Sequence, residues 1–452
     1  MRIIIAGCGK IGKSILISLI KENHEIAVID SDPDVISSIS DSYDVLTVCA
    51  KATDITALKG VGVSSAELFI AATGSDENNM LSSFLAKRMG ASHTVARISS
   101  QSYDDSEAFY KRQFELSMII NPDLLTARAI ANALKFPSAV KSESFTRHLF
   151  EMAELNIRPQ SPLDGALLYK LREKIEADFL VCCVLRDKKA IIPNGSFTLK
   201  AGDRIGLLAA PNDMQKLLKS MGILNKCAKD VMILGASKTA VYLAEMLTKS
   251  GNRVKIIEKD LKRCTEISSV LPRSVSIIHG DGSRHSVLSD EGIESTDAYV
   301  TLTGIDEENI LSSYYALDKN VPKIITKVNQ EGFGDISEKL GLSCAVSPRR
   351  ITADAVTQYA RALYSSSGSS IETLYSLMNG SVEAMEFSVS EDFKKAGIPL
   401  RDLNLKQGIL LAGIIRGTKT VIPKGIDVIM PHDRVIVISA GRRLYGLSDI
   451  LL

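Results

Sequence analysis

The stretch that decides the fold is MRIIIAGCGKIGKSILISLIKENHEIAVID, residues 1–30. A β-branched run ends at Gly7, glycines follow at Gly9 and Gly12, and Asp30 closes a second apolar run. A strand that leads into G-x-G-x-x-G and a helix, with an acid about 20 residues later, is the fingerprint of a dinucleotide-binding βαβ unit. The spacing therefore predicts a nucleotide site at this end of the chain.

Each residue of the fingerprint has a physical task. Gly7 permits the tight turn, Gly9 lets the backbone approach the pyrophosphate, and Gly12 allows the helix to pack closely on the strand. The pyrophosphate would lie on the free N–H groups of the helix start. Asp30 would bind the ribose hydroxyls and repel a 2′-phosphate, which favours NAD(H) over NADP(H) and leaves ATP allowed. A glycine-rich turn without a ligand is the alternative.

The chain is a tandem repeat. RIIIAG at 2–7 recurs as VMILG at 231–235, and ATGSDENNMLSS at 72–83 recurs as LTGIDEENILSS at 302–313. Such self-similarity indicates a duplicated structural unit. The later parts of the two units also match, with VLRDKKAIIPNG at 184–195 and IIRGTKTVIPKG at 414–425.

Each repeat has two parts. Strands alternate with helices in the first part, which predicts a parallel, doubly wound sheet. Short strands separated by turn residues follow, which predicts a small α+β domain. The expected fold is therefore α/β, with Rossmann-like domains at 1–136 and 226–365 and small α+β domains at 137–225 and 366–452. SSSGSS at 365–370 is the most linker-like stretch.

Composition excludes several classes of protein. The 452 residues are too many for one core and suggest two to four domains. The 54 basic and 53 acidic residues nearly cancel, which gives nucleic-acid binding no electrostatic support. No apolar run approaches the ~18 residues of a membrane helix, and no signal peptide is recognised, so a cytoplasmic protein is expected. Seven cysteines without C-x-x-C spacing indicate reduced thiols and no metal site.

The second copy of the fingerprint is degenerate. It reads Gly235-Ala236-Ser237-Lys238-Thr239-Ala240, and only its first glycine is kept. Ser237 places a side chain where the phosphate should approach, whereas Glu258 and Thr303-Gly304 are retained. Nucleotide binding with a weaker or different preference and an empty structural copy are both open.

No catalytic constellation accompanies the two sites. None of the six histidines recurs between the repeats, and no Tyr-x-x-x-Lys pair follows the third strand. Because a dehydrogenase needs an acid or base beside the nicotinamide, a sensor is expected and an NAD-dependent oxidoreductase is the alternative. Cys8 would have a redox role if the helix start stabilised its thiolate, but a small buried side chain is the simpler interpretation.

The same residues resemble a known family. GCGKIG at 7–12, Asp30, TGSDENN at 73–79, Arg97-Ile98 and NPDLLTARAIA at 121–131 resemble the RCK, or KTN, domains that regulate potassium uptake. The strand-rich parts resemble the C-terminal ligand-binding domain that accompanies them. Two N-parts and two C-parts in alternation over the whole chain are similar to the TrkA-like regulatory subunits.

The resemblance implies a function and a location. It implies a cytoplasmic subunit that lies on the inner face of the membrane, binds a TrkH-like potassium transporter and self-associates as a dimer or a tetramer ring. NAD(H), and also ATP or ADP, would change the ring and so gate uptake. An adaptor for a different membrane channel is a further alternative.

The resemblance also implies the residues of the two sites. Arg97 would contact phosphate or a neighbouring subunit, and Asp76 would cap the next helix. The third strand ends in Ala50-Lys51 in the first repeat and in Gly280-Asp281 in the second, so the sites need not prefer one ligand. The implied nucleotide-binding residues are Gly7, Cys8, Gly9, Lys10, Ile11, Gly12, Asp30, Thr73, Gly74 and Arg97, with Gly235, Ala236, Ser237, Lys238, Thr239, Glu258, Thr303, Gly304 and Lys327 in the second repeat.

Overall fold

The computed structural model divides the chain into two units. One consists of Met1–Ala127 with Ser347–Ala360, and the other of Arg128–Val346 with Arg361–Leu452. The predicted domain boundaries near 136, 225 and 365 and the predicted linker at 365–370 lie outside the described residues, so the four-domain division stays a prediction. The structure describes residues 1–100, 103, 106–135, 141–145, 149–159, 161–221, 228–330, 332–342, 344–364 and 371–452.

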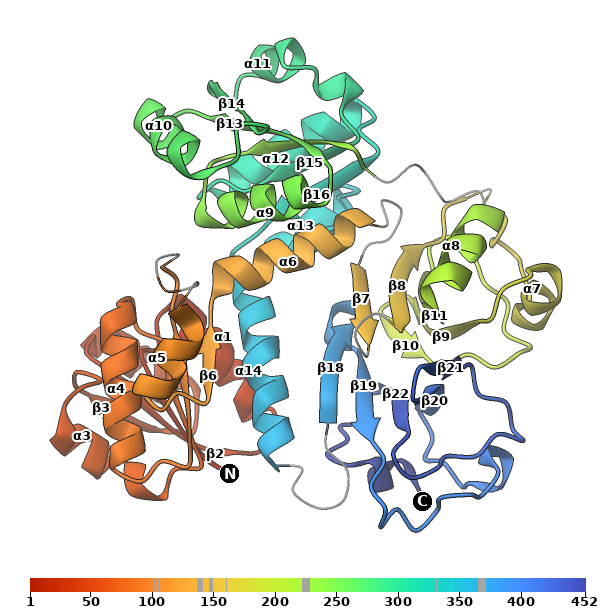
Figure 1. Cartoon of the computed structure of the whole chain (residues 1–452), viewed down its shortest axis with the longest axis horizontal. Coiled ribbons are helices and arrows are strands. Elements are labelled where there is room, and N and C mark those ends of the chain that lie inside the picture. Colours follow the sequence, from red (N-terminus) through yellow and green to blue (C-terminus); the bar gives the residue numbers. More distant parts are fainter. Residues whose placement is uncertain are drawn as a thin grey trace. The chain divides into compact units, whose positions relative to one another are not determined.

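The first sheet is parallel throughout and has the strand order β3-β2-β1-β4-β5-β6 (Figure 1). Its centre is β1, where three isoleucines are fully buried because helices cover both faces of such a sheet. The order reverses between β1 and β4, which is where doubly wound sheets bind ligands. The strands are β1 (Arg2–Ala6), β2 (Glu25–Asp30), β3 (Leu46–Cys49), β4 (Leu68–Ala71), β5 (His93–Arg97) and β6 (Met118–Ile120).

Helices connect these strands. Asp54 caps α3 by accepting from two backbone N–H groups, and Pro33 occupies the first turn of α2, as is common at helix starts. The helices are α1 (Lys10–Ile20), α2 (Pro33–Ser42), α3 (Ile55–Gly60), α4 (Asp76–Arg88), α5 (Glu107–Gln113) and α6 (Pro122–Lys135).

The second repeat builds the same sheet, in the order β14-β13-β12-β15-β16-β17. Its strands are β12 (Asp230–Leu234), β13 (Arg253–Glu258), β14 (Ser276–His279), β15 (Ala298–Thr301), β16 (Lys323–Lys327) and β17 (Ala345–Val346). Its helices are α9 (Lys238–Lys249), α10 (Leu261–Val270), α11 (His285–Asp290), α12 (Asp306–Asp318), α13 (Phe333–Lys339) and α14 (Pro348–Tyr364).

Most of α14 packs with the first repeat, although the second repeat encodes it. Residues Ser347–Ala360 belong to the unit of the first sheet. Tyr359 meets His93 of β5 edge to face, with the ring centroids 6.4 Å apart. A helix encoded by the second repeat thus packs in the unit of the first sheet. The similarity of the two repeats did not predict this.

The strand-rich parts form two five-stranded antiparallel sheets, in the orders β10-β9-β11-β8-β7 and β18-β19-β22-β20-β21. The predicted fold class of Rossmann-like domains with small α+β domains is thus confirmed. The first contains β7 (Lys141–Phe145), β8 (Phe150–Asn156), α7 (Leu168–Lys174), β9 (Phe179–Arg186), β10 (Lys189–Ile191), β11 (Arg204–Ala209) and α8 (Pro211–Ser220). The second contains β18 (Ile371–Leu377), β19 (Val382–Ser388), β20 (Ile409–Arg416), β21 (Lys419–Val421) and β22 (Arg434–Ala440).

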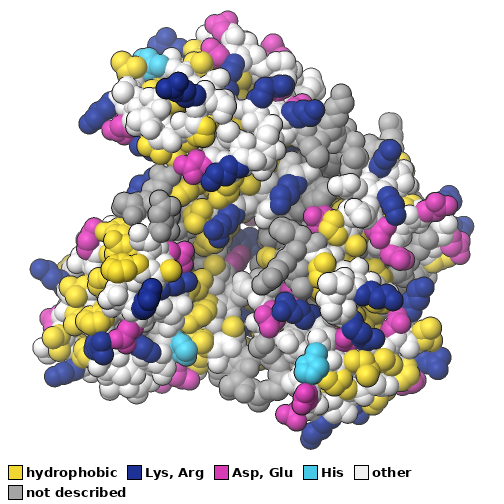
Figure 2. Space-filling view, in the orientation of Figure 1, with side chains coloured by type: hydrophobic (Ala, Val, Ile, Leu, Met, Phe, Trp, Pro, Cys, Tyr) yellow, Lys and Arg dark blue, Asp and Glu magenta, His cyan; other side chains and the backbone are white. Residues whose placement is uncertain are grey.

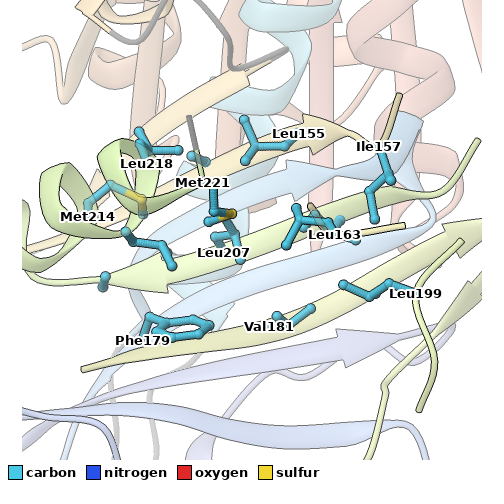
Figure 3. Close-up of a cluster of buried hydrophobic side chains, with 14 of the residues drawn as sticks. Leu155, Ile157, Leu163, Phe179, Val181, Leu199, Leu207, Met214, Leu218 and Met221 are labelled. Carbon is cyan, nitrogen blue, oxygen red and sulfur yellow. The ribbon is translucent and has the colours of Figure 1, made fainter. Parts of the chain in front are cut away.

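One face of the first antiparallel sheet packs against its own helix α8. Met214 and Leu218 lie four residues apart and therefore on one side of the helix, where they meet Leu207 of β11 and Phe179 of β9 (Figure 3). Leu155 of β8 belongs to the same cluster. This cluster is the core of the first small domain.

The other face of that sheet packs against the second small domain. Side chains alternate along a strand, so Phe150 and Met152 of β8 point away from Leu155 and enter a cluster shared with Ile436 and Ile438 of β22. Gly413 of β20 leaves room for this contact, because a Cβ there would lie 3.1 Å from Cε2 of Phe150. The two small domains thus share one core within a single chain.

We predict that Phe150→Ala destabilises this pair of domains. Phe150 is 1% exposed, and removing a buried Phe side chain costs about 3–5 kcal/mol. The midpoint of urea unfolding should fall accordingly. Leu452→Ala is the control because Leu452 is 86% exposed and should change nothing measurable. Equal effects of the two substitutions would contradict the shared core.

Candidate nucleotide site

The first glycine loop leaves space at one of its three glycines. Gly7 has a φ of +88°, and a Cβ there would lie 2.6 Å from the backbone N of Thr73. A Cβ on Gly12 would lie 2.0 Å from the Gly7 carbonyl oxygen. A Cβ on Gly9 would meet nothing within 4 Å. Packing therefore requires Gly7 and Gly12, whereas Gly9 borders open space that a ligand can fill.

The start of α1 carries free donors. Gly9 is the N-cap, and no side chain of the described residues caps the helix. The N–H groups of a first helical turn lack partners within the helix and attract anions. Lys10 is exposed and Ile11 half-buried at this end. The predicted phosphate cradle is thus geometrically available.

The Asp30 carboxylate closes one side of the loop. Its Oδ2 accepts from the Cys8 backbone N–H at 2.6 Å, and its Oδ1 accepts from that of Asp32 at 3.0 Å. A carboxylate has about four lone-pair positions, so both oxygens can still accept from ribose hydroxyls. The two backbone contacts hold the group in place for that purpose.

The Cys8 thiol lies in an environment that disfavours its thiolate. Its side chain is 2% exposed. Burial, and then the nearby Asp30 carboxylate, raise the pKa of the thiol to about 12. Because only the thiolate is a strong nucleophile, Cys8 acts as a small buried side chain. Cys8 forms no disulfide bond.

A buried asparagine, missed by the sequence reasoning as a site residue, organises the opposite side of the loop. Oδ1 of Asn79 accepts from N–H and Oγ1 of Thr73 at 2.8 and 2.7 Å. Its Nδ2 donates to the Arg97 carbonyl oxygen at 2.8 Å. Asn79 thereby fixes the end of β4 to the end of β5. Its signal was the recurrence of the same residue as Asn309 in the repeat.

Arg97 brings a positive charge to this edge. Its Nη1 donates to the Thr73 carbonyl oxygen at 3.4 Å. Its Nε is buried and has no hydrogen-bond partner among the described residues. A buried donor without a partner costs free energy, and an anionic ligand would supply one. Gly74 lies beside it, with nothing within 4 Å of a Cβ built there.

The predicted cap at Asp76 was wrong. The N-cap of α4 is Ser75, whose Oγ accepts from the Asn78 N–H at 3.2 Å. Asp76 instead accepts from the N–H groups of Ser99 and Ser100 at 3.0 and 2.8 Å. These contacts fix the loop after β5, so the carboxylate does not serve as the cap of α4.

The second site repeats most of this geometry. Gly235 has a φ of +91°, and Glu258 accepts from the Ala236 and Asp260 N–H groups at 2.7 and 2.9 Å. Asn309 binds Thr303 N–H and Oγ1 at 3.0 and 2.8 Å. Gly304 borders open space like Gly74.

Several side chains of the second site differ from those of the first. Ser237 caps α9, and its Oγ accepts from the Ala240 N–H at 3.4 Å. Lys327, the counterpart of Arg97, is 8% exposed, and its Nζ donates to the Leu302 carbonyl oxygen at 3.3 Å. Thr239 is 1% exposed, so its side chain does not face a ligand, whereas Lys238 lies at the helix start.

Among the described residues, no three His, Cys, Asp or Glu side chains could hold a metal ion. No helix within those ranges is long and apolar enough to span a membrane.

Comparison with known families matches both kinds of domain. The TrkA-N domain family matches residues 3–122 and 231–348, and the TrkA-C domain family matches 152–222 and 384–451. The chain is 30% identical to the Trk system potassium uptake protein TrkA homolog 1 of Methanosarcina mazei, over 97% of both chains. It is 29% identical to the TrkA homolog of Archaeoglobus fulgidus, over 100% of both.

Solved structures share the fold. The GsuK channel bound to NAD aligns with a TM-score of 0.63 over 97% of this chain and 77% of that chain, at 16% identity. GsuK bound to ADP aligns with a TM-score of 0.50 over 79% of this chain and 68% of that chain, at 14% identity. At such identities the likeness establishes the fold alone.

We predict that alanine destabilises the protein more at Gly7 than at Gly9. Gly7→Ala forces a left-handed backbone, which costs about 1–2 kcal/mol, and its Cβ would collide with Thr73. Gly9→Ala has no steric conflict and should cost less than about 1 kcal/mol. Thermal unfolding of the two variants checks the contrast. Equal losses of stability would contradict the described loop.

Proposed function

The chain belongs to the TrkA family, and on that premise we propose that it is the cytoplasmic regulatory subunit of a potassium transporter that senses nucleotides. It would bind a TrkH-like membrane subunit on the inner face of the membrane. The relatives are named potassium uptake proteins, which supports regulation and not catalysis.

The first site carries this proposal. Open space at Gly9, free N–H groups at the start of α1, the fixed carboxylate of Asp30 and the unpartnered Nε of Arg97 lie around one loop. The helix N–H groups suit a pyrophosphate and the acid suits a ribose, while the Arg97 charge favours an anion nearby. NAD(H) is the expected ligand, and ATP or ADP fits the same ribose and phosphate contacts. GsuK, which shares this fold, has been solved with NAD and with ADP.

Two continuous helices suit this chain to a switch. Helices α6 and α14 each contain residues of both units of the chain. Near the C-terminal end of α14, Nη1 and Nη2 of Arg361 donate to the Glu383 carboxylate at 2.8 and 2.9 Å. A ligand shifts a chain between two arrangements only by its difference in affinity for them.

Self-association into a dimer or a ring would use the outer faces of α4 and α12. Leu81 on α4 is 45% exposed, and its counterpart Leu311 on α12 is 68% exposed, with Tyr314 beside it at 50%. Figure 2 shows hydrophobic side chains gathered over the first of these faces. The same apolar position on both repeats suits a second copy of this chain as the partner.

We predict that Asp30→Ala removes nucleotide binding at the first site. The loss of hydrogen bonds to the ribose should weaken NADH at least about tenfold. Calorimetric titration of the nucleotide-stripped protein with NADH, NAD⁺, ATP and ADP measures this. Asp41→Ala, on the exposed face of α2, is the control. Consumption of NADH with a small substrate would favour an oxidoreductase, and no binding of any of the four would refute the proposal.

We predict that Leu311→Glu lowers the oligomeric state. A charge placed within a buried apolar contact is costly, so the assembly should dissociate in sedimentation velocity. Ile426→Glu, at a 70% exposed site in the second small domain, should leave it intact. An unchanged assembly in the first variant would exclude this face.

A further inference from the structure

The two nucleotide sites differ in charge at the turn after their second strand. Residues 30–35 read DSDPDV, with three acids and no base, whereas residues 258–263 read EKDLKR, with two acids and three bases. Both turns have the same local structure, because Asp32 and Asp260 each cap the helix that follows. The sites thus share a shape and have opposite local charge.

One of the three bases reaches the phosphate loop. Nε of Arg263 donates to the Ala236 carbonyl oxygen at 2.8 Å. Its Nη1 lies 3.1 Å from a carboxylate oxygen of Glu266, and the side chain is one-third exposed. The guanidinium therefore lies beside the glycine loop of the second site. Val35 occupies the same position in the first repeat.

The second loop lacks two features that favour a dinucleotide. The space that Gly9 leaves open in the first site is taken by the Ser237 side chain, so a backbone approach to the pyrophosphate is obstructed. The Ser237 hydroxyl also occupies the Ala240 N–H group at the helix start. A phosphate chain here must find its neutralising charge elsewhere, and Arg263 supplies it.

We propose that the second site takes an adenine nucleoside polyphosphate of the ATP or ADP class, whereas the first takes NAD(H), and that Arg263 makes this choice. The inference rests on the proposed function, since it assumes that both loops bind nucleotides. A polyphosphate chain carries more negative charge than the internal pyrophosphate of a dinucleotide, so it gains more from a guanidinium. A 2′-phosphorylated dinucleotide is disfavoured because Glu258 keeps a carboxylate at the ribose.

The test is an exchange of the two residues in the full-length, nucleotide-stripped protein. In the Asp30→Ala background, which leaves the second site, ATP should bind more tightly than NADH. Adding Arg263→Val should weaken ATP about tenfold or more and leave NADH nearly unchanged. In the Glu258→Ala background, which leaves the first site, Val35→Arg should shift preference toward ATP. These affinities come from calorimetry, with thermal unfolding to establish that each variant is folded.

Arg253→Val is the matched control. Arg253 begins β13, at the other end of the strand from Glu258, and pairs with Asp230. This variant removes one charge from the same domain, so its ATP affinity should stay at the wild-type value. A loss equal to that of Arg263→Val would mean that net charge, not Arg263, sets the preference.

The outcomes separate the two proposals. If the wild type binds nucleotides but the second site prefers NADH, or if Arg263→Val weakens ATP and NADH equally, this inference fails and the proposed function stands. If the wild type binds none of the nucleotides, both fail. If Arg263→Val does not fold, Val35→Arg in the Glu258→Ala background decides. The inference expects this variant to gain affinity for ATP, and no gain would overturn it.

Discussion

The close approach of two loops at the switch point of the sheet underlies the rest of the first site. Gly7 lies so near Thr73 that no side chain fits between them, and Asn79 holds Thr73 from the other side while it binds the end of β5. These contacts fix three parallel strands at their carboxyl ends. The helix start, the acid of β2 and the cation of β5 then face one place. The second repeat keeps this frame even where its fingerprint is lost, which indicates that the frame serves the fold as well as a ligand.

Duplication within one chain separates two tasks that a symmetric dimer must share. In a homodimer, one substitution changes both sites at once. Here Gly9 and Ser237 occupy equivalent positions and impose different conditions on a phosphate. The two copies have the same topology, yet the turn after the second strand is acidic in one and basic in the other. A regulatory protein with two such sites can respond to two signals with one scaffold.

Local signals in the sequence predicted the parts of the molecule that local chemistry determines. The glycine spacing predicted the first loop, and the repeat predicted the second sheet. The sequence did not predict the roles of residues that act through contacts with distant parts of the chain. Asn79 and Arg263 act through backbone groups of other elements. Ser75 and Asp76 are both common caps, and only their positions in the fold decide between them. The packing of α14 with the first repeat could not be predicted from the similarity of the repeats. An amphipathic helix has the same sequence pattern whichever domain it packs against.

The shared core of the small domains constrains how the chain is made. Domains generally fold from the amino end during synthesis. The face of β8 that carries Phe150 and Met152 is buried against residues of β22, which lie more than 280 positions later in the chain. The native contacts of this apolar face cannot all form until β22 has left the ribosome. Release of a chain cut short within the second repeat would leave it exposed to the solvent, where it would invite aggregation. A product that ends before β22 therefore lacks part of the cover of this surface.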